Sequence, residues 1–267
     1  GGDASIPYKW EMAKFIELAG GPQARMVAIP TASEDSDVGY YYTDLFRETY
    51  GCPNVVTLDI KSRADAARPD FVERAAAASG IFFGGGDQTR ITRAILDTPV
   101  GDAIAAAFAR GAVVGGTSAG TACQSPLMIT GEGDFTVIRA GSVELWRGFG
   151  LFRDVVVDQH FIARQRSNRL ISVILQHPAM LGVGVDEDTA VWVRPDATFE
   201  VLGKRCVMVL DASHATVSRR PGENGKDDLG VHGLTTHILL RGEVFDLKTR
   251  SVVDSPAHQA GEKLEGR

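Results

Sequence analysis

A serine flanked by small residues is the feature of this chain with the clearest chemical meaning. Ser118 lies in the run Gly116-Thr117-Ser118-Ala119-Gly120, directly after the apolar residues 112–114. An apolar run followed by a sharp turn into a helix is typical of a nucleophile elbow, which holds a serine at the carboxyl end of a buried strand. The N–H of Ala119, at the start of that helix, is the first candidate donor to an oxyanion. The alternative interpretation is a chance glycine pattern in which the serine only caps a helix.

A second apolar run leads into a glycine loop. Residues 81–83 precede the loop Gly84-Gly85-Gly86-Asp87-Gln88. Because the carboxyl ends of parallel strands share one edge of a sheet, we expect this loop beside the serine. The N–H of Gly85 or Gly86 would supply the second oxyanion donor, and Gln88 would bind substrate. A phosphate-binding loop is disfavoured, because the Lys-Ser/Thr ending and the Gly-x-Gly-x-x-Gly spacing are both absent.

A candidate general base follows a third apolar run, which ends in Asp158-Gln159-His160. Strand alternation would put Asp158 and His160 on one side of the sheet and Gln159 on the other. A lone histidine is more often structural, but the elbow makes His160 the preferred base. The other histidines lie at a predicted helix end or in the irregular C-terminal part: His177, His214, His232, His237 and His258.

Three arginines follow the histidine, at Arg164, Arg166 and Arg169. Arg166 and Arg169 would share one face of a helix. Guanidinium groups bind carboxylates with two hydrogen bonds, so the cluster predicts an acidic substrate. The alternative is a solvated helix face, which is slightly favoured for Arg164.

The acid of a catalytic triad has more than one candidate. Glu187 closes a predicted strand and gives the order Ser, His, acid. Asp134 or Glu132, in the loop after the elbow, would instead give the order of the α/β-hydrolases. Triads are defined by the roles of their members rather than by their order, so only geometry decides between these residues.

Apolar runs alternate with helical periodicity along most of the chain. The pattern predicts helices at 9–18, 42–50, 69–78, 89–110 and 166–176, and strands at 26–29, 55–58, 80–83, 112–116, 155–157, 181–185, 190–193, 199–202 and 206–210. This alternation predicts an α/β fold with a mostly parallel sheet and helices on both faces. We expect the later strands to form an antiparallel extension of the same sheet, and residues 221–228 an exposed loop. The prediction is one domain over residues 1–267.

The composition excludes several classes of function. The chain has 267 residues, 44% of them hydrophobic, and a formal net charge of −6, which argues against a general nucleic-acid binder. No apolar stretch approaches the length of a membrane span. The three cysteines are far apart, which argues against disulfides and a Cys-rich metal site. The chain starts without methionine, so we expect a missing upstream segment. The default expectation is a cytoplasmic protein, or a secreted one if that segment was a signal peptide.

Taken together, these residues resemble the cyanophycinases, within the serine peptidase family that also contains aspartyl dipeptidase. The similarity spans nearly the whole chain, and the Asp-Gln-His-Phe run with its arginines is specific to the cyanophycinase side. The matching segments are 28–33, 84–88, 116–120, 157–161 with Arg164, Arg166, Arg169 and Leu170, 182–190 and 201–204. The segment 130–145 departs most from the family pattern.

The resemblance implies a class I glutamine-amidotransferase-like, flavodoxin-like fold, a homodimer and a cofactor-free serine exopeptidase. Its substrate would be cyanophycin, a poly-aspartate with arginine on each β-carboxyl, and its product β-Asp-Arg. By position, Ser118 would be the nucleophile, His160 the base and Glu187 the preferred acid. The residues implied to line the pocket are Gln88, Asp158, Gln159, Arg164, Arg166 and Arg169.

Three alternatives to this function stay open. The nearest is an aspartyl or isoaspartyl dipeptidase, or another β-linked aspartyl peptide hydrolase with the same machinery. An esterase of the α/β-hydrolase type would cleave simple esters but not peptides. A binding protein on this fold would keep the arginine pocket and lack turnover.

Overall fold

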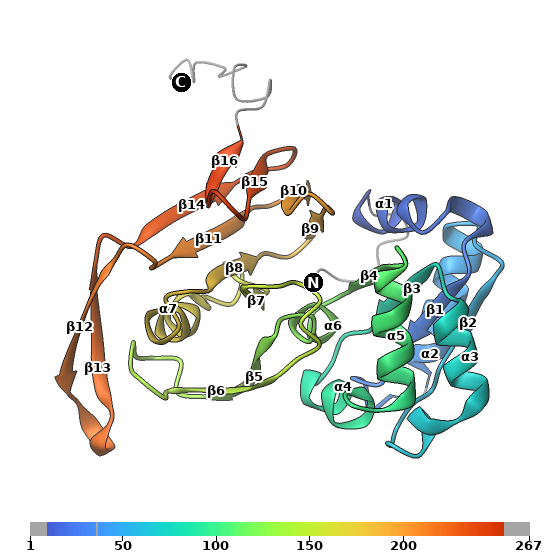
Figure 1. The fold of residues 1–267 in the computed structure, drawn as a ribbon, viewed down its shortest axis with the longest axis horizontal. Coiled ribbons are helices and arrows are strands. Elements are labelled where there is room, and N and C mark those ends of the chain that lie inside the picture. Colours follow the sequence, from blue (N-terminus) through green and yellow to red (C-terminus); the bar gives the residue numbers. More distant parts are fainter. Residues whose placement is uncertain (1–9, 36, 254–267) are drawn as a thin grey trace.

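The computed structural model describes residues 10–35 and 37–253, and its first half is built on a parallel sheet (Figure 1). The sheet has the order β2-β1-β3-β4, and each neighbouring pair is parallel. Its strands are β1 (Met26–Ile29), β2 (Val55–Thr57), β3 (Gly80–Phe83) and β4 (Val113–Gly116). Each strand is a short run of apolar residues and glycine, as expected of a sheet covered on both faces.

Helices cover both faces of this sheet, as predicted. One face packs against α1 (Trp10–Leu18) and α2 (Val38–Asp44), which a π-helical turn at Leu45–Thr49 extends. The other face packs against α3 (Pro69–Ala77), α4 (Gln88–Ile95) and α5 (Pro99–Ala109). Residue 9, the predicted start of the first helix, lies outside the described residues.

The second half of the chain forms further sheets. One has the order β14-β11-β8-β7, in which β7 and β8 are parallel and the other pairs antiparallel. The other, β16-β15-β10-β9, is antiparallel throughout. The bounds are β7 (Val155–Gln159), β8 (Leu181–Val185), β9 (Thr189–Val193), β10 (Thr198–Gly203), β11 (Val207–Asp211), β14 (Thr235–Leu239), β15 (Val244–Asp246) and β16 (Ser251–Val253), with α7 (Ser167–Gln176) packed against β8.

The expectation of an antiparallel extension of the first sheet is therefore wrong in one respect. Within the described residues, the later strands pair among themselves and form no ladder with β4. The short helix α6 (Ala119–Ala122) and strand β5 (Leu127–Gly133) instead contact β7 and bring it next to the first half of the molecule.

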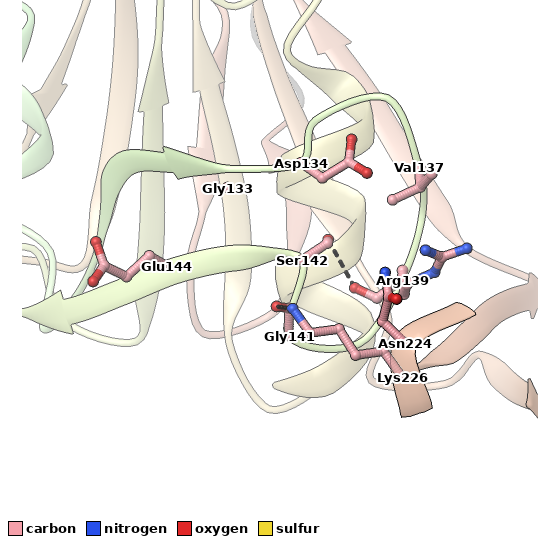
Figure 2. A pocket seen from close by; sticks show the side chains of 9 residues that line it. All are labelled: Gly133, Asp134, Val137, Arg139, Gly141, Ser142, Glu144, Asn224 and Lys226. Carbon is pink, nitrogen blue, oxygen red and sulfur yellow. Dashed lines mark hydrogen bonds between the residues drawn. The ribbon is translucent and has the colours of Figure 1, made fainter. Parts of the chain in front are cut away.

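Two antiparallel hairpins complete the fold. The first joins β5 (Leu127–Gly133) to β6 (Val143–Arg147), and the second joins β12 (Thr216–Pro221) to β13 (Asp227–His232). The tip of the second lies against the loop of the first (Figure 2). The predicted exposed loop at 221–228 is thus too long, because its outer residues pair as strands and only 222–226 form the turn.

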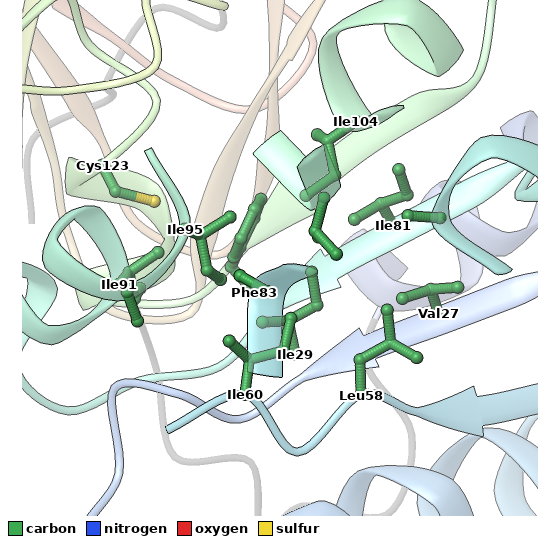
Figure 3. Close-up of a cluster of buried hydrophobic side chains, with 14 of the residues drawn as sticks. Val27, Ile29, Leu58, Ile60, Ile81, Phe83, Ile91, Ile95, Ile104 and Cys123 are labelled. Carbon is green, nitrogen blue, oxygen red and sulfur yellow. The ribbon is translucent and has the colours of Figure 1, made fainter. Parts of the chain in front are cut away.

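The side chains of β1 and β3, with Leu58 and Ile60 from the segment after β2, lie in a large apolar cluster (Figure 3). Phe83 at the end of β3 is fully buried there and stacks on Phe149, whose ring centroid lies 5.4 Å away. This packing anchors the carboxyl ends of β3 and β4, where the glycine loop and the serine follow.

Other expectations concern membranes, metals and cysteines. Over residues 10–35 and 37–253, no helix combines the length and apolarity needed to cross a bilayer. The same residues contain no group of three or more His, Cys, Asp or Glu arranged for a metal ion. Cys52 and Cys123 are buried, Cys206 is partly buried, and all three are free.

Candidate active site

Two pairs of parallel strands bring the candidate residues to one place. Phe83 at the end of β3 pairs with Gly116 at the end of β4, so the glycine loop and Ser118 emerge side by side. Gln159 at the end of β7 pairs with Val185 at the end of β8. His160 therefore follows one strand by one residue, and Glu187 follows its neighbour by two.

The backbone at Ser118 is strained, with φ 51° and ψ −110°. The flanking glycines make this turn possible. A Cβ on Gly116 would lie 2.4 Å from the carbonyl oxygen of Gly120, and a Cβ on Gly120 would lie 2.2 Å from the carbonyl oxygen of Phe83. These close approaches leave no room for a side chain two residues before or two residues after the serine, as in a nucleophile elbow.

A line of hydrogen bonds connects the serine to a carboxylate. The Oγ of Ser118 lies 3.0 Å from Nε2 of His160. The Nδ1 of the same ring lies 3.0 Å from Oε1 of Glu187. The His160 side chain is 12% exposed and that of Glu187 is 32% exposed, so solvent reaches the carboxylate more easily than the imidazole.

The alternative acids lie elsewhere. The carboxylate of Asp134 accepts hydrogen bonds from the backbone N–H and hydroxyl of Thr136, within its own loop. Glu132 lines the pocket in front of Ser118. The carboxylate that bonds the imidazole of His160 is that of Glu187.

Burial lowers the pKa of His160 below its ordinary value. The hydrogen bond to Glu187 opposes this shift, while Arg164 and Arg166 add to it by charge repulsion. The imidazole is therefore neutral at pH 7, which is the state that accepts a proton.

The two glycine candidates for the oxyanion hole differ. The N–H of Gly85 donates to the hydroxyl of Tyr42 at 3.3 Å, so the expectation that it faces an oxyanion is not met. Gly86 lines the pocket and has φ 137°, and a Cβ there would lie 2.2 Å from the carbonyl oxygen of Ala32. Ala119 is the first residue of α6, where backbone N–H groups have no partner within the helix.

A pocket of about 660 Å³ opens in front of Ser118. Its charged side chains are of both signs. The lining residues are Gly86, Asp87, Gln88, Thr89, Arg93, Ser118, Thr130, Gly131, Glu132, Glu144, Trp146, Gln159, Arg164, Arg166 and Arg169.

The structure corrects the expectation for Asp158. This residue is 1% exposed, and its carboxylate accepts two hydrogen bonds from the guanidinium of Arg169, which is itself buried. His160 adopts φ 51° directly after β7, which ends the strand alternation. His160 therefore does not share a side with Asp158, which points into the protein, whereas Gln159 reaches the pocket.

The other two arginines are more accessible. Arg166 is half-buried and donates to the backbone carbonyl of Gln159 at 2.7 Å and to that residue's side-chain oxygen. Burial and the charge of Arg169 lower the pKa of Arg166 to about 10, so it stays charged at pH 7. Arg164 is exposed at the rim, with its backbone N–H bonded to the carbonyl of His160.

Gln88 links the glycine loop to the first hairpin. It is buried, and its amide nitrogen donates to the carbonyls of Ile129 and Thr130 at 2.6 and 2.8 Å. The side-chain oxygen of Gln88 is left as the polar atom it can offer to the pocket.

Strand β6 builds a wall of the pocket that was not predicted from the sequence. Glu144 and Trp146 alternate along this strand and both line the pocket, and the guanidinium of Arg93 lies 4.4 Å from the centre of the Trp146 ring. Alternation over residues 143–147, with apolar residues at 143 and 145, was the signal for this strand.

Comparisons with known proteins identify relatives of this chain. A cyanophycinase of Synechococcus elongatus is 36% identical over 243 residues, which cover 90% of this chain and 75% of the relative. A cyanophycinase of a Nostoc species is 37% identical, covering 90% of this chain and 80% of the relative. One of Geminocystis herdmanii is 34% identical, covering 93% and 92%. These identities confirm the resemblance that the motifs indicated.

Among solved structures, the crystal structure of a peptidase from an acI-B1 Actinobacterium has the same fold. It superposes with a TM-score of 0.69 at 23% identity, covering 92% of this chain and 94% of that one. The model of peptidase family S51 matches residues 7–201, which include all the candidate site residues. The chain therefore belongs to peptidase family S51 and is a serine peptidase.

Proposed function

We propose that this enzyme hydrolyses the poly-aspartate backbone of cyanophycin and releases β-Asp-Arg. The observation that carries the proposal is the hydrogen-bonded line from Ser118 through His160 to Glu187, placed beside a pocket with charges of both signs. The relatives named cyanophycinase support the choice of polymer.

In the proposed mechanism, Nε2 of His160 takes the proton of Ser118 as Oγ attacks the backbone carbonyl of a β-linked aspartyl unit. Glu187 holds the proton on Nδ1 and stabilises the imidazolium that forms. The N–H groups of Ala119 and Gly86 receive the oxyanion. His160 then protonates the leaving amine, and water, deprotonated by His160, hydrolyses the acyl-enzyme and regenerates the serine.

The pocket supports a zwitterionic substrate. Each unit of the polymer carries an arginine carboxylate and an arginine guanidinium. Arg164 and Arg166 suit the carboxylate, because guanidinium groups form paired hydrogen bonds with it. Glu132 and Glu144 suit the guanidinium and replace Asp158 in this role, since the carboxylate of Asp158 is bound to Arg169. Ordinary α-peptides lack this pairing of charges and should be poor substrates.

The proposal includes a class I glutamine-amidotransferase-like fold and a homodimer. The parallel sheet with helices on both faces, and a serine turn after its edge strand β4, support the fold. Light scattering coupled to size exclusion would test the dimer, and a monomeric mass at assay concentrations would overturn it.

The function is tested by incubating the wild-type protein and Ser118→Ala with purified cyanophycin and analysing soluble products by mass spectrometry. We expect β-Asp-Arg from the wild type and loss of nearly all turnover in the variant, with the fold unchanged. Activity of Ser118→Ala near that of the wild type would overturn the mechanism. Cleavage of aspartyl or isoaspartyl dipeptides without attack on the polymer would overturn the substrate and favour a β-aspartyl dipeptidase.

A further inference from the structure

A second cavity, of about 420 Å³, lies beyond the catalytic pocket (Figure 2). We call it the distal pocket. It forms where the loop between β5 and β6 meets the tip of the hairpin β12–β13. Its lining residues are Gly133, Asp134, Val137, Arg139, Gly141, Ser142, Glu144, Asn224 and Lys226.

The distal pocket is built from segments that hold one another in place. Arg139 is buried and pairs with Asp228 at 2.6 Å and with Glu223 at 3.5 Å. The ammonium of Lys226 donates to the carbonyl of Gly141 at 2.5 Å. The backbone N–H of Ala140 also bonds into the second hairpin. The walls are therefore connected across the sequence, and the cavity is a fixed feature of the fold.

The distal pocket continues the catalytic pocket. Glu144 lines both cavities. Along β5, residues 130–132 line the catalytic pocket, and Gly133 with the adjoining Asp134 lines the distal one. The register between β5 and β6 shifts between Ile129 and Gly133, so the ribbon is irregular where the two cavities meet.

The charges of the distal pocket suit a repeat of the same zwitterionic unit. Lys226 uses one of its three N–H donors on Gly141 and keeps the others for a carboxylate. The carboxylate of Asp134 accepts from Thr136 through Oδ1 and keeps Oδ2 for a guanidinium, whereas Glu144 lies on the wall shared with the catalytic pocket, where it is already assigned. A peptide chain advances about 3.3–3.6 Å per residue, as β5 itself does, so a polymer lying along β5 would pass roughly one unit per strand residue.

We propose that the distal pocket is an exosite that binds units of a polymeric substrate several positions away from the scissile bond. This inference rests on the proposed function, because it assigns the site a repeating zwitterionic substrate. The exosite gives the enzyme a preference for long chains over the shortest cleavable one, and Lys226 contributes by binding an arginine carboxylate.

The test measures kcat/KM for defined β-Asp-Arg oligomers, from two units to about eight, a length that exceeds the expected reach along β5. In the wild type we expect kcat/KM to rise with length and then level off. In Lys226→Met, kcat/KM on long oligomers should fall by about three- to tenfold, the effect of one or two exposed charge contacts. Cleavage of the two-unit substrate should be unchanged.

Matched variants separate the exosite from general effects of charge. Lys226→Arg keeps the charge and should retain the preference for long chains, whereas Lys226→Glu should reduce it further than Lys226→Met. Lys248→Met removes the charge of an exposed lysine that lines neither pocket and should behave like the wild type. Circular dichroism spectra should show the same secondary structure in all of these variants.

The two proposals fail in different ways. If the wild type cleaves no oligomer, the proposed function is wrong. If it cleaves the two-unit substrate but shows no gain with length, or if Lys226→Met and Lys226→Glu keep the full gain, the exosite is wrong and the function stands.

Discussion

Arg164 and Arg169 belong to one cluster in the sequence but have different surroundings in the fold. Arg169 is buried against the carboxylate of Asp158, whereas Arg164 is exposed at the rim of the catalytic pocket. A buried charge that loses its partner is costly, while an exposed one is held by solvent. The ion pair between Arg169 and Asp158 therefore stabilises the structure of the site. The exposed guanidinium of Arg164 is available to bind substrate in the proposed mechanism.

Asp158→Asn and Arg164→Gln should separate these roles. We expect Asp158→Asn to lower the free energy of unfolding by about 3–5 kcal/mol, because the Arg169 charge stays buried without a carboxylate. Arg164→Gln should change it by no more than about 0.5 kcal/mol while raising KM. Urea unfolding and steady-state kinetics measure both quantities. Equal stability of the two variants would contradict the assignment.

The pKa of His160 sets the acid limit of activity. In the proposed mechanism the neutral imidazole is the base, so activity should be lost as pH falls through its pKa, which burial holds below the ordinary 6.5. The profile of kcat/KM against pH should therefore have its acid limb below pH 6.5. An acid limb above that value would contradict this environment.

The variant Glu187→Gln tests whether Glu187 is the acid of the triad. The amide can no longer stabilise an imidazolium, so kcat should fall by about a thousandfold or more. The acid limb of any residual activity should move to lower pH, because the hydrogen bond to Glu187 is what raises the pKa of His160. An unchanged kcat would remove Glu187 from the mechanism.

At this scale the residue types could be predicted and their orientations could not. The patterns around Ser118 and His160 were sufficient to select these two residues. The choice between Gly85 and Gly86 depended on Tyr42, more than forty residues away. Asp158 and His160 do not share a side because the backbone of His160 is left-handed, which strand alternation does not include.

At the scale of elements, the turn from β4 into α6 depends on glycine. Gly120→Ala places a Cβ 2.2 Å from the carbonyl oxygen of Phe83, so the strand and helix must move apart. We expect a loss of at least about 2 kcal/mol in the free energy of unfolding, together with most activity. Gly233→Ala is the control, since that glycine has φ 76° with nothing within 4 Å. Gly233→Ala should lower the free energy of unfolding by only about 1–2 kcal/mol and leave kcat unchanged.

The turn after β7 has its own anchor. Asp186 is buried, and its Oδ1 accepts the backbone N–H of Ala163 at 3.0 Å, while Arg205 lies 3.3 Å from Oδ2. Asp186→Ala frees this turn, and because His160 begins it, kcat should fall by about tenfold or more. Asp186→Asn keeps an oxygen acceptor and should restore much of kcat. Equal kcat values for the two variants would show that this hydrogen bond does not position the base.

The elements themselves were predicted well where their pattern is local. The strands at 26–29, 80–83 and 181–185 have the predicted bounds, and the helix at 166–176 begins one residue later. Strand β5 was missed because Gly131 and Gly133 interrupt its pattern, whereas β6 does show alternation that could have been recognised. The pairing of the later strands was harder to predict, because the pattern of apolar residues in a strand does not show which neighbouring strand it pairs with.

At the scale of the whole molecule, the candidate triad is divided between two halves. Ser118 follows the first sheet, whereas His160 and Glu187 follow strands of the second. The hydroxyl of Ser125 accepts the N–H of Val157 at 2.8 Å and so ties the halves together beside the site. The hydrogen bond between Ser118 and His160 also joins the two halves, so the candidate triad requires that they stay together.

We therefore predict that activity and structure are lost together. In urea, peptidase activity, tryptophan fluorescence and far-ultraviolet circular dichroism should follow one transition if the contact between Ser125 and Val157 and its neighbours couple the two halves into one cooperative unit. This would also support the expectation of a single domain. Loss of activity well before the loss of secondary structure would mean that the halves separate first.

The hairpin tip at 222–226 can vary in length and charge without a change in the residues of the candidate triad. Six residue pairs between β12 and β13 hold the tip in place, and it reaches the distal pocket without touching the catalytic serine. Tips of other lengths and charges can thus be grafted there, with the bond-breaking chemistry inherited unchanged. We expect selection from a library of variants at these five positions to give enzymes with different preferences for polymer length and an unchanged Ser118, His160 and Glu187.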